Sequence, residues 1–330
     1  MQRVLRHGVF TLSFDFELVW GSRDRVADPT PLEREALVTR DQVFETILSM
    51  LVARDIRATW ATVGHLFLSG AEPGDRGLHP EVIPPRHAWR AVPWLQGVPA
   101  GTEQSQPAWY ARSLVERLVE ASQEVACHSF SNPIFGDPGC SREAAASELA
   151  RCVALAEELG IALKSFVFPR NVPGHVDLLA EHGFTSWRPP EPAWFLHPSI
   201  PGSVARLAQL AEVATGRAPP TVLPVRDRHG LWQIAGSGRF LPAHGIRRAI
   251  PMVQRARRAI AGIERAVAER RISHLYVHPI SFAAAPEPML RAFEMVLDAA
   301  MAHRNAGQLD TLSMDQVTRL CEAGVMFAPE

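Results

Sequence analysis

The stretch Val9-Phe10-Thr11-Leu12-Ser13-Phe14-Asp15-Phe16-Glu17, close to the N-terminus, decides how this chain is organised. Its apolar and β-branched residues predict a buried strand that ends in two carboxylates. Positions i and i+2 of a strand share a face, so Asp15 and Glu17 point the same way while Phe16 packs inside. Buried carboxylates are costly unless a cation, a hydrogen-bond partner or a proton neutralises them. Taken alone, the pair is more readily explained as two solvated acids where a strand meets a loop.

Strand-like and helix-like segments alternate along the rest of the chain. The expected strands are residues 57–64, 124–130, 165–169, 185–188, 231–235 and 274–279, and the expected helices are residues 33–54, 107–122, 141–160, 175–182, 246–271 and 286–304. Ser141 is placed to cap the third of these helices. Repeated strand-then-helix units predict an α/β fold with a mostly parallel sheet, open or barrel-shaped. We expect one domain over residues 1–330.

Residues 69–108 are rich in Gly, Pro and Trp and show little periodicity. This segment is too long for a simple connection, which indicates an ordered insertion that could form a lid over a site. Three tryptophans in or next to it, Trp89, Trp94 and Trp109, could stack on a sugar ring. Packing of the insertion onto the body of the protein is the more ordinary role for these tryptophans.

Composition narrows the classes of partner. The formal net charge of −1 and the 21% of charged residues give no electrostatic reason to expect nucleic acid or an anionic membrane. No apolar run approaches the roughly 18 to 20 residues of a membrane helix, and residues 1–7 lack the apolar core of an export signal. We therefore expect a cytoplasmic protein with a small-molecule or sugar substrate rather than mature cell wall. The cysteines, which show no CxxC spacing and are expected to be reduced thiols, are Cys127, Cys140, Cys152 and Cys321.

Polar residues of a catalytic kind follow several of the expected strands. Besides Asp15 and Glu17, these are His128 with Asn132, Arg170 with Asn171, and His278. Each alone has an ordinary structural explanation, such as a hydrogen-bonded histidine or a loop ion pair. Active sites of parallel α/β folds assemble at the carboxyl ends of the strands, so the set together predicts a site there.

Four phrases carry a resemblance to a known family: residues 13–21, 58–64, 128–132 and 166–171. With them the chain resembles the polysaccharide deacetylases with NodB homology, carbohydrate esterase family four. The resemblance covers about residues 9–190 and resumes at residues 274–282. It implies a distorted (β/α) barrel and metal-assisted hydrolysis of an N-acetyl or related acyl group on an amino sugar or a soluble sugar-containing intermediate.

The resemblance also implies roles for individual residues. Asp15 resembles the base that activates water, and His278 the acid that protonates the leaving amine, although His274 lies four residues earlier and is an alternative. Arg170 resembles the arginine that orients the base, in a motif shifted from the common family pattern. Glu17 and His128 take the places of metal ligands. These roles suit amide hydrolysis, which needs an activated water, stabilisation of the oxyanion and a proton for the nitrogen.

One departure from the family pattern concerns the metal. The second metal histidine, four residues after the first, is Asn132 in this chain. An amide oxygen is a poorer ligand for zinc than imidazole, although hard cations accept it. Three interpretations remain open: a weakened or different divalent metal site, with zinc the first candidate; metal-independent hydrolysis of a C–N bond; or a catalytically silent carbohydrate-binding barrel.

Overall fold

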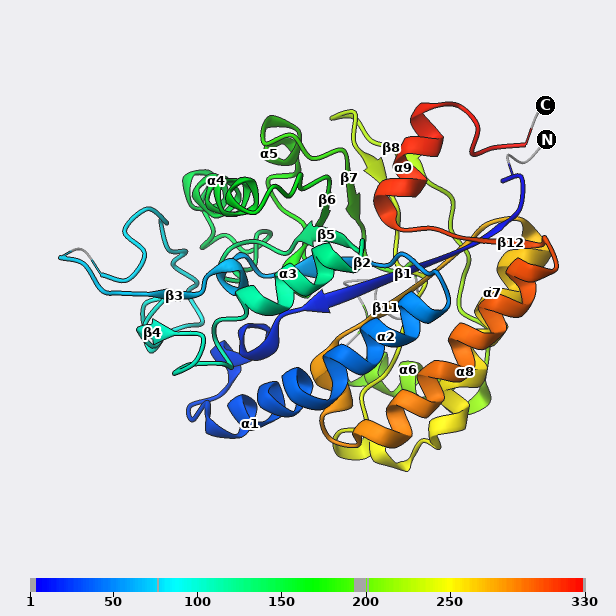
Figure 1. Cartoon of the computed structure of the whole chain (residues 1–330), viewed down its shortest axis with the longest axis horizontal. Coiled ribbons are helices and arrows are strands. Elements are labelled where there is room, and N and C mark those ends of the chain that lie inside the picture. The colour runs from blue at the N-terminus through cyan, green and yellow to red at the C-terminus, as the bar shows by residue number, and fades with distance from the viewer. Residues whose placement is uncertain (1–3, 76, 193–199, 201, 329–330) are drawn as a thin grey trace.

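The central strand of the protein is β1 (Gly8–Phe16), which is buried along its whole length. In the computed structural model, which describes residues 4–75, 77–192, 200 and 202–328, β1 pairs in parallel with three strands (Figure 1). These strands are β11 (Ile272–Val277), β2 (Thr59–Thr62) and β12 (Leu309–Thr311). The apolar run at the N-terminus thus becomes the middle of the sheet, as the sequence predicts.

The main sheet is curled and almost entirely parallel. Its strand order is β10-β11-β1-β2-β5-β6-β7-β9-β8, and the only antiparallel pair among these described strands is β8 with β9. The remaining bounds are β5 (Glu124–Cys127), β6 (Ser165–Val167), β7 (Ser186–Arg188), β8 (Val225–Arg226), β9 (Trp232–Gln233) and β10 (Gly238–Arg239). The predicted (β/α) barrel is confirmed as an open half-barrel.

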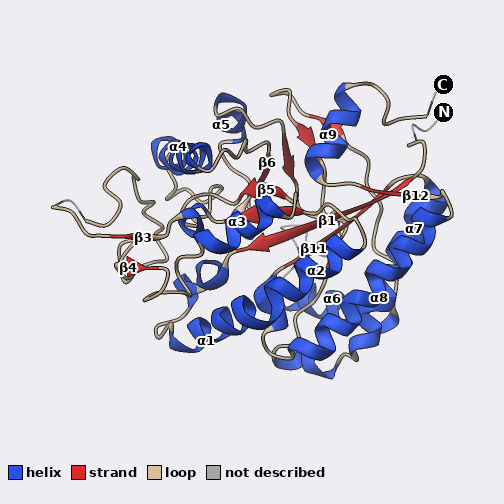
Figure 2. Cartoon of the chain, viewed as in Figure 1, coloured by secondary structure: helices blue, strands red, loops and turns tan. Residues whose placement is uncertain are grey.

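Helices cover the outside of this sheet (Figure 2). They are α1 (Thr30–Val38), α2 (Glu45–Ala53), α3 (Arg112–Glu120), α4 (Arg142–Glu158), α5 (Val176–Glu181), α6 (Gly202–Thr215), α7 (Met252–Glu269), α8 (Pro286–Asn305) and α9 (Met314–Glu322). Ser141 caps α4 as expected, because its hydroxyl accepts a hydrogen bond from the Ala144 N–H. Apolar faces of the helices pack on the sheet, where Phe293 of α8 meets Phe14 of β1 edge to face with ring centroids 6.1 Å apart.

Two helix predictions were wrong in detail. The expected helix 33–54 is divided into α1 and α2 by a π-helical turn at Thr39–Phe44. The expected helix 246–271 begins only at Met252, because Pro251 disfavours helical backbone in the residue before it and Ile250 is extended. The sequence assigned no element to residues 189–224, so α6 was not predicted, and neither were β12 and α9.

The insertion is closed at its base by a short antiparallel pair, β3 (Gly70–Ala71) with β4 (Gly101–Thr102). Within it, the Trp94 indole N–H donates to the Ser131 hydroxyl at 2.9 Å, so the insertion supports the loop that follows β5. None of the four cysteines, all of which lie in the described part of the chain, forms a disulfide. Within the described part of the chain, no helix is both long and apolar enough to cross a bilayer.

Candidate active site

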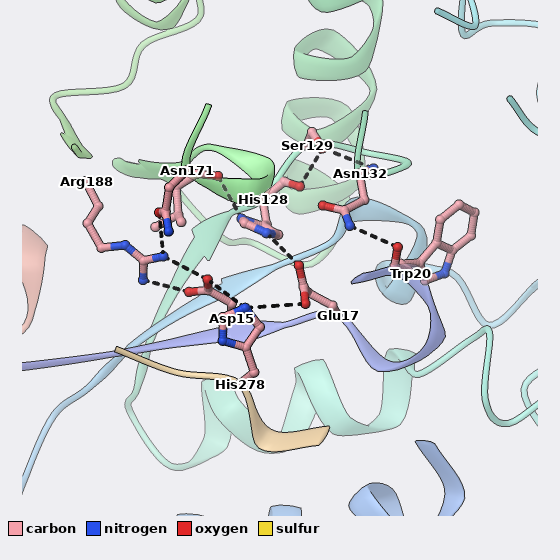
Figure 3. A network of polar contacts seen from close by, with 10 residues as sticks. Asp15, Glu17, Trp20, His128, Ser129, Asn132, Asn171, Arg188 and His278 are labelled. Carbon is pink, nitrogen blue, oxygen red and sulfur yellow. Dashed lines mark hydrogen bonds and ion pairs between the residues drawn. The ribbon is translucent and has the colours of Figure 1, made fainter. Parts of the chain in front are cut away.

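Five side chains from four strand ends meet at the carboxyl edge of the sheet (Figure 3). Asp15 lies near the end of β1 and Glu17 directly after it, His128 follows β5, Arg188 ends β7, and His278 follows β11. Because these four strands are parallel neighbours or near neighbours in the sheet, their ends converge as the sequence predicts.

Asp15 is held by a buried guanidinium. Arg188 Nη1 donates to Asp15 Oδ1 at 2.6 Å and Nη2 donates to Oδ2 at 2.8 Å, and the two side chains are only 1% and 4% exposed. Arg188 also donates to the Ser13 hydroxyl and to Asn171 Oδ1. Burial opposes the charge of Asp15, but Arg188 and His278 outweigh it and hold the pKa of this carboxyl well below its usual range. Asp15 is therefore a fixed anion.

The structure corrects the expectation that Arg170 orients Asp15. Arg170 forms its ion pair with Asp24 and lies over the Trp89 ring, 5.5 Å from its centroid. Its backbone is left-handed, with φ of 56°, as is that of Asn171. This reversal of the chain after β6 directs the Arg170 side chain to the mouth of the site, and Arg188 takes the place beside Asp15.

Glu17 and His128 form the second pair of the site. His128 Nε2 lies 3.0 Å from Glu17 Oε1, and His128 Nδ1 lies 2.7 Å from the Val167 carbonyl oxygen. Burial opposes the charge on Glu17, but the hydrogen bond from His128 and the charge of His278 hold the pKa of Glu17 below its usual value. Both ring nitrogens of His128 thus face oxygen atoms, and Nε2 is the one turned toward Glu17.

Asn132 lies beside this pair with one polar atom unused. Its Nδ2 donates to the Trp20 carbonyl at 2.9 Å and its backbone N–H donates to Ser129 Oγ at 3.1 Å. Its Oδ1 is buried and has no hydrogen-bond partner among the described residues. With φ of 63°, Asn132 adopts the left-handed conformation that asparagine tolerates best among residues with a side chain.

These three residues pass a simple test of fit for a divalent cation. Glu17 offers a carboxylate, His128 an imidazole nitrogen turned toward it, and Asn132 an amide oxygen that lacks a donor. An orphaned buried oxygen next to a carboxylate is what a bound cation would satisfy. Among the described residues, however, no group of three or more His, Cys, Asp or Glu side chains is arranged to hold a metal ion. Binding of a cation by Glu17 and His128 would thus need the amide oxygen of Asn132 as the third ligand.

His274 lies within β11 and His278 directly after it, and the two histidines differ sharply in their surroundings. His278 Nε2 lies 3.4 Å from Asp15 Oδ2 and 3.8 Å from Glu17 Oε2, and its side chain is 18% exposed. His274 is fully buried, 2.8 Å from the Ser13 hydroxyl and 3.1 Å from the Ile234 carbonyl. Burial lowers the pKa of His274 to about 3 and that of His278 to about 4. Only His278 faces the open side of the site.

A cavity of about 430 Å³ opens above these residues and is lined by Asp15, Glu17, Arg170 and His278 among others. This volume lies in the range of small-molecule sites. The cavity lining contains none of the described residues of the insertion, so a lid function for residues 69–108 stays a prediction. Trp94 and Trp109 are buried, at 2% and 3% exposed, whereas Trp89 is 47% exposed beside Arg170. Only Trp89 is open enough to receive a sugar ring.

Glu148 on α4 anchors the loop that carries Asn132. It is fully buried and accepts hydrogen bonds from the Ser131 backbone N–H, at 2.7 Å, and from the Ser131 hydroxyl. Burial raises the pKa of Glu148 to about 7, against the hydrogen bonds from Ser131 and the charge of Arg23. The sequence offered no signal for this role, because Glu148 occurs in the middle of a helical segment.

Sequence reasoning also missed Arg188 and Arg239. Arg188 was included in an expected strand, and its position as the last residue of β7 is the signal that places it at the site edge. Arg239 lies in the two-residue strand β10, which has too little periodicity to be predicted, and it lines the same cavity.

Comparison with solved structures places the chain in a fold class. It shares its fold with a Mycobacterium smegmatis protein described as a polysaccharide deacetylase, at a TM-score of 0.61 and 12% identity over 98% of this chain and 93% of the other. A Pseudomonas aeruginosa PAO1 protein described in the same way has a TM-score of 0.59 and 10% identity, covering 96% of this chain and 91% of that one. The resemblance stated from the motifs is thus confirmed for the fold.

The same fold also serves another named activity. The PuuE allantoinase matches with a TM-score of 0.59 and 12% identity over 96% of this chain and 89% of the other. No protein-family model matches the sequence. No curated protein matches it either. The TM-scores establish a NodB-type fold. Because the sequence identities are this low, they say nothing of the activity, which has to be argued from the site.

Proposed function

We propose that the protein is a hydrolase of the polysaccharide deacetylase type that removes an acyl group, in the first instance acetyl, from the nitrogen of an amino sugar. The observation that carries the proposal is the pairing of Asp15 and His278, 3.4 Å apart, in one cavity of about 430 Å³. A fixed carboxylate next to an imidazole that is open to the cavity provides both partners for proton transfer in amide hydrolysis. The size of the cavity suits a monosaccharide unit.

In this proposal Asp15 accepts a proton from the attacking water as the water oxygen bonds to the acyl carbon. Arg188 keeps the carboxylate in place through its two hydrogen bonds. His278 donates a proton to the nitrogen as the C–N bond breaks, which leaves a free amine and a carboxylic acid. Because His278 Nε2 lies near both Asp15 and Glu17, it can return a proton between the two stages.

Glu17, His128 and Asn132 are the residues that would hold a divalent cation, zinc in the first instance. When bound, such an ion supplies a Lewis acid that lowers the pKa of water and stabilises the oxyanion. The unpartnered Asn132 oxygen supports this assignment. Zinc prefers nitrogen and sulfur ligands to an amide oxygen, so we propose a weaker site than one with two histidines.

A second candidate is metal-independent hydrolysis of a C–N bond in another small molecule. The contact that favours it is the 3.0 Å approach of His128 Nε2 to Glu17 Oε1, in which a proton satisfies both side chains without a metal ion. Asp15 and His278 keep their roles in this candidate. A silent carbohydrate-binding barrel would have the same cavity but no turnover.

Acetate release from a panel of N-acetylated sugars, measured with added zinc and with a chelator, tests the proposal. We expect release that is lost in Asp15→Asn, because an amide cannot accept the proton, by the factor of about 10² to 10⁴ typical of a general base. Asp298→Asn, an exposed aspartate on α8, serves as the matched control. Zinc-stimulated release supports the first candidate, chelator-resistant release supports the second, and sugar binding without release in any condition supports the silent barrel.

A further inference from the structure

We infer that the substrate carries an oxyanion group, a phosphate or a carboxylate, which binds to Arg25, Arg170 and Arg239 on the wall of the catalytic cavity. This inference names the substrate class of the proposed function and rests on it. It is carried by the arrangement of charge around the cavity, which the acyl-transfer chemistry does not use.

The three arginines come from separate parts of the fold. Arg25 belongs to a short helical turn after β1, Arg170 to the turn after β6, and Arg239 to β10. All three line the same cavity as Asp15 and Glu17. The chain as a whole has a formal net charge of −1, so this local concentration of guanidinium groups does not reflect a generally basic protein.

Two of the three carboxylates in the cavity lining already have close hydrogen-bond partners. Asp15 pairs with Arg188, Glu17 with His128, and Glu35 lies 3.8 Å from His244. Asp15 and Glu17 are therefore engaged by other side chains, and among the described residues Glu35 forms no ion pair with an arginine.

Arg170 is satisfied by Asp24, but the other two arginines are not matched in this way. Among the residues that the structure describes, neither Arg25 nor Arg239 has a carboxylate within ion-pair distance, and the buried Nε of Arg239 has no hydrogen-bond partner. Burial and the like charges of Arg170 and Arg239 lower the pKa of Arg25, against the opposing charges of Asp24 and Glu17. Guanidinium groups that repel one another across a cavity are stabilised when an anion enters it.

Glu191 is a buried acid whose charge interacts with Arg258 and, to a smaller extent, with Arg239. Burial raises the pKa of Glu191 to about 7, so its negative charge is incomplete at neutral pH. The positive charge of Arg239 is thus available to a ligand. Guanidinium groups bind phosphate and carboxylate through paired hydrogen bonds, which makes these two groups the chemistry that the wall recognises.

Matched ligands without an amide bond separate this inference from the hydrolase proposal. Glucose, glucose 1-phosphate and glucuronate share a ring, cannot be deacylated, and differ in the anionic group. We expect either anion to bind the full-length protein at least about 10-fold more tightly than glucose in calorimetry, with an affinity that falls as salt is added. The tighter of the two anions identifies the group.

Substitution of the cavity arginines is the second part of the experiment. Arg239→Gln and Arg25→Gln should each weaken anion binding by about 10- to 100-fold, the scale of a lost hydrogen bond to a charged group, and leave glucose binding unchanged. Arg291→Gln, at an exposed arginine on α8, is the matched control and should bind like the wild type. Circular dichroism confirms that each variant is folded.

The outcomes are distinct. Equal affinity for glucose and both anions, or anion binding that survives Arg25→Gln and Arg239→Gln, overturns the inference. Failure to release acetate from any N-acetylated sugar overturns the proposed function but leaves the binding result standing. If both hold, N-acetylglucosamine 1-phosphate or N-acetylglucosaminuronate should be deacetylated with a higher kcat/KM than N-acetylglucosamine, and Arg239→Gln should remove that preference.

Discussion

The pairing of Asp15 with Arg188 can be tested without any assay of activity. The perturbations are Asp15→Asn and Arg188→Met, made singly and together. In the structure two hydrogen bonds of 2.6 and 2.8 Å join the two side chains, and neither side chain is more than 4% exposed. Removing either partner leaves the other charge buried and uncompensated, which costs about 3 to 5 kcal/mol.

The double variant removes both charges, so its free energy of unfolding should fall by less than the sum of the single effects. Arg188→Met also loses hydrogen bonds to Ser13 and Asn171, and this part of its effect persists in the double variant. We expect a coupling energy of about 2 kcal/mol or more, against about 0.5 kcal/mol or less for residues that share no contact. Urea unfolding of the four proteins, followed by circular dichroism, measures it.

A second cycle supplies the control. Arg170 pairs with Asp24 rather than Asp15, so Asp15→Asn and Arg170→Met should be additive. Additive effects for Asp15 with Arg188 would refute the pairing described. Strong coupling of Asp15 with Arg170 would instead make Arg170 the arginine that orients Asp15, as the sequence motif implied.

Three further predictions concern neighbouring residues. Burial raises the pKa of Glu148 from 4.5 to about 7, so the stability that its protonated form contributes is complete below pH 4.5 and is lost as the pH rises through 7, by about 3 kcal/mol. Glu148→Gln, which can still accept hydrogen bonds from Ser131, should flatten this part of the pH profile of urea unfolding. An unchanged profile would contradict the role of Glu148. His278→Ala should lower kcat by about 10² to 10⁴ with little change in KM, whereas His274→Ala should lower the melting temperature instead, and an unchanged kcat in His278→Ala would make it a structural residue. Asn132→His should raise zinc affinity by an order of magnitude or more in calorimetry, roughly the scale of a changed metal environment, and no gain in affinity would favour the metal-independent candidate.

The framework of the site could be predicted because it depends on patterns that are local in the sequence. Val9 to Phe14 is apolar enough to be a central strand, and the buried β1 confirms it. Polar residues directly after strands must then gather at one edge of a parallel sheet, which is where Asp15, His128 and His278 lie. Strand β10 and helix α6 escaped prediction because a two-residue strand has no period and because residues 189–224 show little apolar rhythm.

The partner of Asp15 could not be predicted in the same way, because it depends on side-chain direction and not on position along the chain. Arg170 and Arg188 both follow or end strands beside the site, and each is long enough to reach a carboxylate at its centre. What separates them is backbone conformation. Arg170 lies in a left-handed turn that aims it at Asp24, whereas Arg188 is extended in β7, and its side chain projects into the half-barrel. A left-handed residue other than glycine cannot be recognised from the hydrophobic pattern. The sequence motif around Arg170 is therefore present, although Arg188 is the arginine that pairs with Asp15.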